Sequence, residues 1–343
     1  IKDILTGQSQ QLFFRCGELV NTGNELAGDP GTGNSLGLSA SELALALQDI
    51  APEETEIMGA GLTDTSTDQL ASLQNRLSYL RTGTSTLGIA GISWSGENST
   101  IGTGGAASSD DFSKFGVFVT GVTGNGDKGE TNKVNGVENA FDFDANGFTA
   151  GIDYRFSDNL VAGLALSYSK TEATFALDNG DNDTKSTSLA LYGTYFQNDY
   201  FFEATMSVGD LDYDATRNIN YGNNNPNNPS AGEDIVRTLT SETSGSSFSW
   251  SLGGGYSLVN ENQNYTFGAK VTGLNAEIDA YSETGAELAM ALSEQEIDSL
   301  QSIVSAQASI ALSRDFGVVA PFITLAWHHE FDDEAREINS QYV

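Results

Sequence analysis

The chain has 343 residues, and 15 Lys and Arg stand against 47 Asp and Glu, which gives a formal net charge of −32. Nucleic acid would repel so acidic a chain, so DNA or RNA partners are not expected. The single cysteine, Cys16, excludes an internal disulfide framework, and no apolar run reaches the roughly 18 residues of a transmembrane helix.

Residues 1–83 are predicted to be a helical region. A capping box of Ser39 and Glu42 predicts a helix over 39–50. Pro52 suits the first turn of a short second helix. A second capping box, at Ser66 and Gln69, predicts that a third helix starts there and ends before Gly83. This 66–82 helix carries Leu70, Leu73, Leu77 and Leu80 on one face, together with Arg76 and Arg81.

Residues 84–111 are rich in Gly, Ser and Thr and are expected to form an extended linker. From 112 to 343, apolar and polar residues alternate with period two, which predicts nine strands between FGVFVTG and PFITLAWHHEF. In SSFSWSLGGGYSL, residues 246–258, large apolar side chains occupy one face and only serine and glycine occupy the other. The small side chains indicate that another part of the protein passes close to that face.

The connections between the predicted strands alternate between short and long. The short ones are 157–159, 197–199, 260–264 and 313–317, and the long ones are 124–146, 170–184, 212–244 and 275–297. Short turns at one end and long external loops at the other are typical of antiparallel barrels in an outer membrane. We therefore predict an all-β transmembrane barrel whose apolar face, about nine to eleven residues tall, contacts lipid. A soluble β-sandwich would explain the alternation but not the loop pattern.

The alternation assigns side chains to two environments. Those predicted to face lipid are Phe148, Tyr154, Phe202, Phe248, Trp250, Tyr256 and Trp327. Those predicted to face the lumen are Asp153, Arg155, Glu203, Ser249, Ser251, Gly253, Lys270, His328 and Glu330. Polar groups inside a barrel need partners, so the two arginines of the 66–82 helix should meet the lumen-facing carboxylates if that helix enters the pore.

Several segments, in this order, resemble the C-terminal translocator of bacterial autotransporters, the type V secretion systems. GFTAGIDYRFSDNLVAGLALSYS and TSLALYGTYF resemble its second to fourth strands, SWSLGGGYSL its sixth, and AWHHEFDDEAREI a motif in its later strands. The upstream stretch from FFRCGELV to QLASLQNRLSYLRTG resembles the helical segment that precedes the barrel in one subgroup.

The resemblance implies a monomeric barrel of about twelve strands in the outer membrane of a Gram-negative bacterium, with a linker in its pore. An N-terminal passenger domain would be exported to the cell surface. The implied partners are outer-membrane lipid, the barrel-assembly machinery and the chain's own passenger. Since nine strands are counted, the barrel region 112–343 is expected to be incomplete at its C-terminal end.

Two alternatives remain open from the sequence. In the first, the 66–82 helix, with part of the linker, either lies in the pore or packs outside the pore against neighbouring helices. In the second, the chain is either an autotransporter translocator or a small porin or surface adhesin barrel, with residues 1–111 as a binding module.

No catalytic set is found, so neither an enzyme nor a cofactor or metal site is expected. His328 and His329 alternate faces and cannot hold one metal together, so a polar contact between His328 and Glu330 is expected instead. DFDANG, residues 142–147, resembles the start of a calcium-binding loop, but Asp153 at its twelfth position falls within a strand, so an acidic loop is expected.

The lone cysteine and two asparagines are also considered as functional residues. Cys16 is expected to be a small buried residue. Asn75 and Asn98 lie in the region where some autotransporters cleave themselves, and nothing in the sequence selects either.

Overall fold

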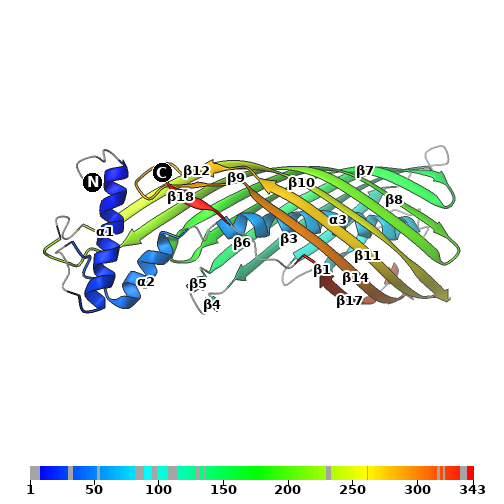
Figure 1. Ribbon diagram of the computed structural model, residues 1–343. Coiled ribbons are helices and arrows are strands. Elements are labelled where there is room, and N and C mark those ends of the chain that lie inside the picture. Colours follow the sequence, from blue (N-terminus) through cyan, green and yellow to red (C-terminus); the bar gives the residue numbers. More distant parts are fainter. Residues whose placement is uncertain are drawn as a thin grey trace.

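The computed structural model describes residues 8–29, 34–51, 55–81, 89–94, 99–106, 114–128, 131–133, 136–138, 140–228, 233–260, 262–314, 317–319, 321–332 and 338–343. Figure 1 shows one long, curled sheet, with a helix running along it and two helices at one end. No helix in this part of the chain is both long enough and apolar enough to cross a membrane.

The helices are α1 (Gln8–Leu26), α2 (Ala40–Asp49) and α3 (Thr55–Arg81), with a short 3₁₀ helix at Ala176–Asp178. The predicted capping box of α2 is confirmed, because Ser39 and Glu42 each accept a hydrogen bond from the other's backbone amide. The predicted helix start at Ser66 is wrong, since α3 runs through it without a break. No proline follows Pro52 in this stretch, so no residue blocks the helical hydrogen bonds. α1 is not among the predicted helices.

The main sheet has eleven antiparallel strands in the order β1-β2-β3-β6-β7-β8-β9-β10-β11-β14-β17. Their bounds are Ile89–Trp94, Ser99–Ala106, Phe115–Lys128, Phe141–Ser157, Leu160–Phe175, Gly180–Gln197, Tyr200–Tyr221, Ile235–Asn260, Gln263–Ile278, Gln295–Ile310 and Phe322–Glu330. Three small sheets complete the fold: β4 (Thr131–Lys133) with β5 (Gly136–Glu138), β12 (Tyr281–Ser282) with β13 (Met290–Leu292) and β18 (Ser340–Tyr342), and β15 (Leu312–Arg314) with β16 (Gly317–Val319).

The nine strands of the main sheet from β3 to β17 confirm the nine that alternation predicts. Two more, β1 and β2, lie within residues 84–111, where an extended linker is expected. Their sequences, IAGISW and STIGTGGA, consist mostly of small residues, so they offer little contrast between apolar and polar positions.

The connections at one end are shorter than predicted, because the strands continue into them. β9 has 22 residues and β10 has 26. At about 3.3 Å per residue, each is more than twice as long as the roughly 30 Å of a bilayer's hydrocarbon core. The connection expected over 212–244 is thereby reduced to 222–234.

The alternation of β9 changes sense near Gly209. From Tyr200 to Val208 the outward side chains are apolar, as in Phe202 and Met206, and the inward ones are mostly polar. Beyond Gly209 the outward side chains are Asp210, Asp212 and Asp214, and the buried apolar inward ones are Leu211, Tyr213, Ile219 and Tyr221. The first part has the length and polarity of a strand that crosses lipid, and the second is built like a sheet in water.

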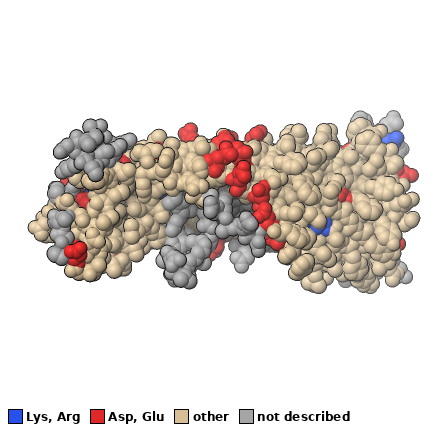
Figure 2. All heavy atoms as spheres, viewed as in Figure 1, with Lys and Arg blue, Asp and Glu red and all other residues tan. Residues whose placement is uncertain are grey.

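The same change occurs across neighbouring strands. Figure 2 shows the carboxylates as a band across the middle of the molecule, next to a broad, almost uncharged surface toward the end with the short turns. The other end, where α1 and α2 lie, is called the outer end below (Figure 1). The inversion therefore separates a part of the sheet with an apolar exposed face from an outer extension whose exposed face is acidic.

Candidate functional site

α3 lies along the inner face of the sheet, where it contacts β3, β7, β8, β9 and β11. Leu73 and Leu77 of α3 are completely buried, and Leu70 and Leu80 are nearly so. The cluster around them consists of Phe118, Val161, Ala165, Ala190 and Tyr192. α3 thus packs against the inner wall of the sheet rather than against neighbouring helices.

Arg76 is held between a carboxylate and an aromatic ring. Its Nη2 lies 2.8 Å from Asp153 Oδ2, and its guanidinium lies 5.2 Å from the centre of the Phe118 ring. The Tyr192 hydroxyl donates to Asp153 Oδ2 at 3.2 Å. A Cβ at Gly116 would stand 2.2 Å from Asp153 Oδ1 and 2.5 Å from Arg76 Nη2. A larger residue at this position would therefore push the ends of both charged side chains aside, which glycine avoids.

Arg81 holds the last turn of α3. It forms an ion pair with Glu203 of β9, and its guanidinium lies 3.8 Å from the centre of the Phe201 ring. Arg155 Nη2 donates to the Leu80 carbonyl at 3.5 Å. These partners lie near the short turns, so the C-terminal end of α3 is at that end of the sheet.

Two glutamines of α3 form further hydrogen bonds with the inner face of the sheet. Lys270 Nζ of β11 donates to Gln74 Oε1, and Ser207 Oγ of β9 donates to Gln69 Oε1 at 2.8 Å. Together with the two arginines, they connect the polar side of α3 to β6, β9 and β11.

The serine and glycine face of β10 lies inside the sheet. Ser249 and Ser251 are buried there. A Cβ at Gly253 would stand 2.8 Å from Lys270 Cβ, and one at Gly255 would stand 2.5 Å from the Phe201 ring. The small residues therefore make room for two side chains that themselves reach toward α3.

The residues predicted to face lipid lie on the outer face of the sheet. Phe148, Phe202, Phe248 and Trp327 are exposed, and Tyr154, Trp250 and Tyr256 are partly exposed. Aromatic pairs gather near the short turns, with ring centres 4.8 Å apart for Tyr200 and Tyr256. Aromatic side chains at this height are typical of a membrane interface.

In the last predicted strand, the expected contact between Glu330 and His328 is not formed. Glu330 accepts hydrogen bonds from Ser299 Oγ at 2.6 Å and from the Leu300 amide at 2.8 Å, rather than from His328 or an arginine of α3. His328 is exposed, and His329 stacks on Trp327 with ring centres 5.6 Å apart.

The acidic loop expected at 142–147 is wrong, because this segment belongs to β6. Asp142, Asp144 and Asn146 are exposed on one face of an extended strand, which cannot wrap around an ion as a calcium loop does. In the described part of the chain, no three His, Cys, Asp or Glu side chains are placed to hold a metal.

The remaining candidates are placed as follows. Cys16 is half-buried on α1, and burial raises the pKa of its thiol. Asn75 is half-buried on α3, and Asn98 lies outside the described residues.

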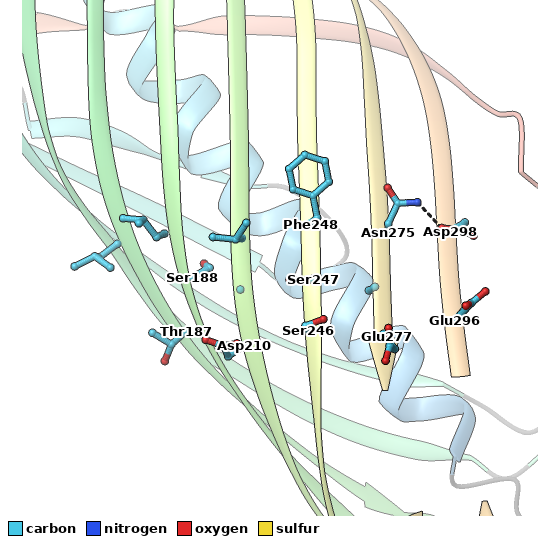
Figure 3. Close-up of a pocket in the computed structure, with 15 residues that line it drawn as sticks. Thr187, Ser188, Asp210, Ser246, Ser247, Phe248, Asn275, Glu277, Glu296 and Asp298 are labelled. Carbon is cyan, nitrogen blue, oxygen red and sulfur yellow. Dashed lines mark hydrogen bonds between the residues drawn. The ribbon is translucent and has the colours of Figure 1, made fainter. Parts of the chain in front are cut away.

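A groove of about 750 Å³ lies where the alternation inverts (Figure 3). Its apolar lining includes Leu166, Leu189, Val208 and Phe248, and its acidic residues are Asp210, Glu277, Glu296 and Asp298. The negative charge of Glu294, with smaller contributions from desolvation and from Asp279 and Glu296, raises the pKa of Glu277. The groove therefore joins an apolar exposed surface to a strongly negative one.

Sequence reasoning missed the aromatic residues of the lumen. Phe118, Tyr192 and Phe201 face inward and are buried, although a lumen is expected to be polar. A signal was available: each pairs across the sheet with a glycine, namely Gly151, Gly163 and Gly255 respectively. A ring can cover a paired glycine because no Cβ stands in its way.

The autotransporter β-domain family matches residues 117–343. Among solved structures, the chain is similar to the translocator domain of the autotransporter NalP from Neisseria meningitidis, with 14% identity, a TM-score of 0.52, and coverage of 81% of this chain and 82% of that chain. The β domain of the Bordetella autotransporter BrkA also matches, with 16% identity, a TM-score of 0.43, and coverage of 67% and 84%. A comparison with curated proteins found no match. Because the family match covers more than half of its length, the chain belongs to the autotransporter β-domain family.

Proposed function

We propose that this chain forms a monomeric outer-membrane barrel, inserted by the barrel-assembly machinery, and that α3 plugs its pore. The autotransporter β-domain is a secretion domain of the bacterial outer membrane, and its linked passenger is exposed at the cell surface. Lipid cannot satisfy the backbone groups of an open sheet edge. We therefore also propose that further strands close the edges formed by β1 and β17.

The direction of α3 is the observation that carries the proposal. Near its start, Met58 is buried at the outer end in a cluster with Tyr281 and Leu292. At its other end, Arg81 and Leu80 lie near the short turns. The chain upstream of α3 therefore emerges on the outer side, where an exported N-terminal passenger belongs.

The residues around α3 support a pore through which the upstream chain passes and in which α3 then stays. Hydroxyl side chains such as Ser249, Ser251 and Thr205 line the inner face and can exchange hydrogen bonds with a moving backbone. When α3 arrives, its leucines fit the apolar cluster around Phe118, and Arg76 reaches a carboxylate. α3 would then rest in the pore after the upstream residues have passed.

Single-channel conductance tests this proposal. We expect the full chain to conduct little in a planar bilayer, and a variant lacking residues 66–82 to conduct several-fold more. The double variant Arg76→Ala, Arg81→Ala keeps the helix and should show frequent openings, which separates loss of the plug from misfolding of the deletion variant. An open porin would instead conduct steadily and equally with and without residues 66–82. That outcome would overturn the plug.

A further inference from the structure

The outer extension of the sheet carries α1 and α2 on its inner face. The buried apolar residues there are Ile219, Tyr221, Ile235 and Leu239 of β9 and β10 with Leu288 and Ala289. They pack against Leu19, Leu36, Leu38 and Ala46 from the N-terminal part of the chain. Figure 1 shows these helices at the strand ends, away from the short turns. We call the first set of residues, together with segment 283–289, the outer docking surface.

Glu287 forms ion pairs with both β10 and α1. Its Oε1 accepts from Arg237 Nη2 of β10 at 2.7 Å and from Arg15 Nε of α1 at 3.3 Å. Arg15 Nη1 also donates to Glu18 Oε2 at 2.8 Å, and Asn228 Nδ2 donates to Glu18 Oε1 at 3.1 Å. Glu287 is 5% exposed and Glu18 is 7% exposed, so these charge-assisted contacts are shielded from water.

The end of α2 and the segment before it are also attached. Arg217 Nη1 donates to the Asp49 carbonyl at 3.2 Å, while Glu283 holds Arg217 through contacts of 2.8 and 2.5 Å. The Asn224 amide donates to the Leu36 carbonyl at 2.7 Å. Apolar, ionic and backbone contacts thus hold α1, α2 and parts of residues 34–39 against the sheet.

We propose that the outer docking surface binds the chain's own residues 8–50 strongly enough to retain them without the covalent link to α3. The inference rests on the proposed function only in taking the outer end as the cell-surface side. Its consequence is that a cut between α2 and α3 leaves the N-terminal part, and whatever precedes it, attached to the barrel.

A protease site placed at residues 52–54 of the full chain tests this in detergent micelles. After cleavage, we expect the N-terminal fragment to elute with the barrel during gel filtration. Ile235→Asp should release it, because Ile235 is 1% exposed within the docking surface. Val236→Asp is the matched control: this neighbour is 59% exposed on the opposite face, so the fragment should stay bound.

A second variant guards against misfolding of the barrel. Arg15→Ala changes only the severed fragment, and we expect the fragment to dissociate at least several-fold faster than wild type. Immediate loss of the wild-type fragment, or equal retention in Ile235→Asp and wild type, would overturn the proposal. Conductance of the same cleaved sample keeps the two proposals apart, since α3 stays with the barrel. A blocked pore without the fragment refutes retention alone, and a conducting pore with the fragment refutes the plug alone.

Discussion

Arg76 of α3 and Asp153 of β6 form an ion pair inside the sheet, with Nη2 and Oδ2 2.8 Å apart and Asp153 only 4% exposed. Taking two charges out of water offsets much of their attraction, so such a pair contributes little net stability. Leaving one charge without its partner, however, is strongly unfavourable. The pair therefore sets the position of α3 along the lumen more than it stabilises the fold.

The first prediction concerns this asymmetry. Asp153→Asn or Arg76→Gln alone should destabilise the plugged state by about 3–5 kcal/mol, because each leaves a buried charge unpaired. The double variant should cost less than the sum of the two. Thermal unfolding in detergent, with the heat-resistant migration of the barrel as a check on folding, measures these differences. Strictly additive effects would contradict the coupling.

The second prediction uses the glycine opposite the pair. Gly116→Ala places a Cβ 2.2 Å from Asp153 Oδ1, so the two charged side chains have to shift and channel openings should become more frequent. Gly121→Ala on the same strand is the control, because its nearest neighbour, the Gly147 carbonyl oxygen, is 4.0 Å away. Planar-bilayer recordings compare the two variants. Equal closure of both would mean that the ion pair does not hold the plug.

Much of the barrel could be predicted because its signal is local. Alternation over 148–156 assigns Asp153 to the inner face without knowledge of any other strand. Likewise, a capping box needs only two residues of α2, and it is present. The burial of Asp153 on the inner face of the sheet and the number of strands from β3 to β17 follow from such signals.

The outer extension could not be predicted in the same way. Beyond Gly209 the alternation persists but reverses, so that apolar residues such as Leu211 and Tyr213 are buried inside. A prediction that looks for strands with an apolar outer face therefore assigns this segment to a loop. The contact of Arg15 with Glu287 joins residues 272 positions apart, and neither residue has a local pattern that indicates the other. Long-range pairing of this kind depends on the folded sheet.

The third prediction tests the lipid-facing surface. Leu164→Arg, in the middle of the apolar part of β7, should reduce the stability of the barrel in vesicles by about 2–4 kcal/mol, because a charge would face the bilayer core. Leu177→Arg is the control. Leu177 is even more exposed, at 71% against 48%, but it lies in the 3₁₀ helix beyond the strand. Denaturant titration in vesicles measures both, and equal losses would contradict the assigned membrane position.

The fourth prediction concerns the pH dependence of fragment retention. Burial opposes the ionised form of Glu287, but hydrogen bonds from Arg237, a backbone amide and Arg15 outweigh it and lower the pKa of Glu287 below 4.5. Arg237 stays on the sheet after cleavage, so only the Arg15 part of this lowering depends on the bound fragment. That part stabilises the complex above the pKa of Glu287 in the fragment-free barrel and is lost as the pH falls through its lower pKa in the complex. Asp49 acts in the opposite sense, because burial raises its pKa.

Comparison of wild type with Glu287→Gln isolates the contribution of Glu287 from that of Asp49. At neutral pH the severed fragment should leave the variant faster, by an amount that corresponds to about 1.5–3 kcal/mol for a hydrogen bond to a charged group. Below pH 4.5, ordinary for a free glutamate, the difference should shrink as wild-type Glu287 becomes protonated and loses its charge as well. Dissociation rates at a series of pH values measure this difference. A difference that stays constant from neutral pH to well below 4.5 would show that the charge of Glu287 does not hold α1 to the sheet.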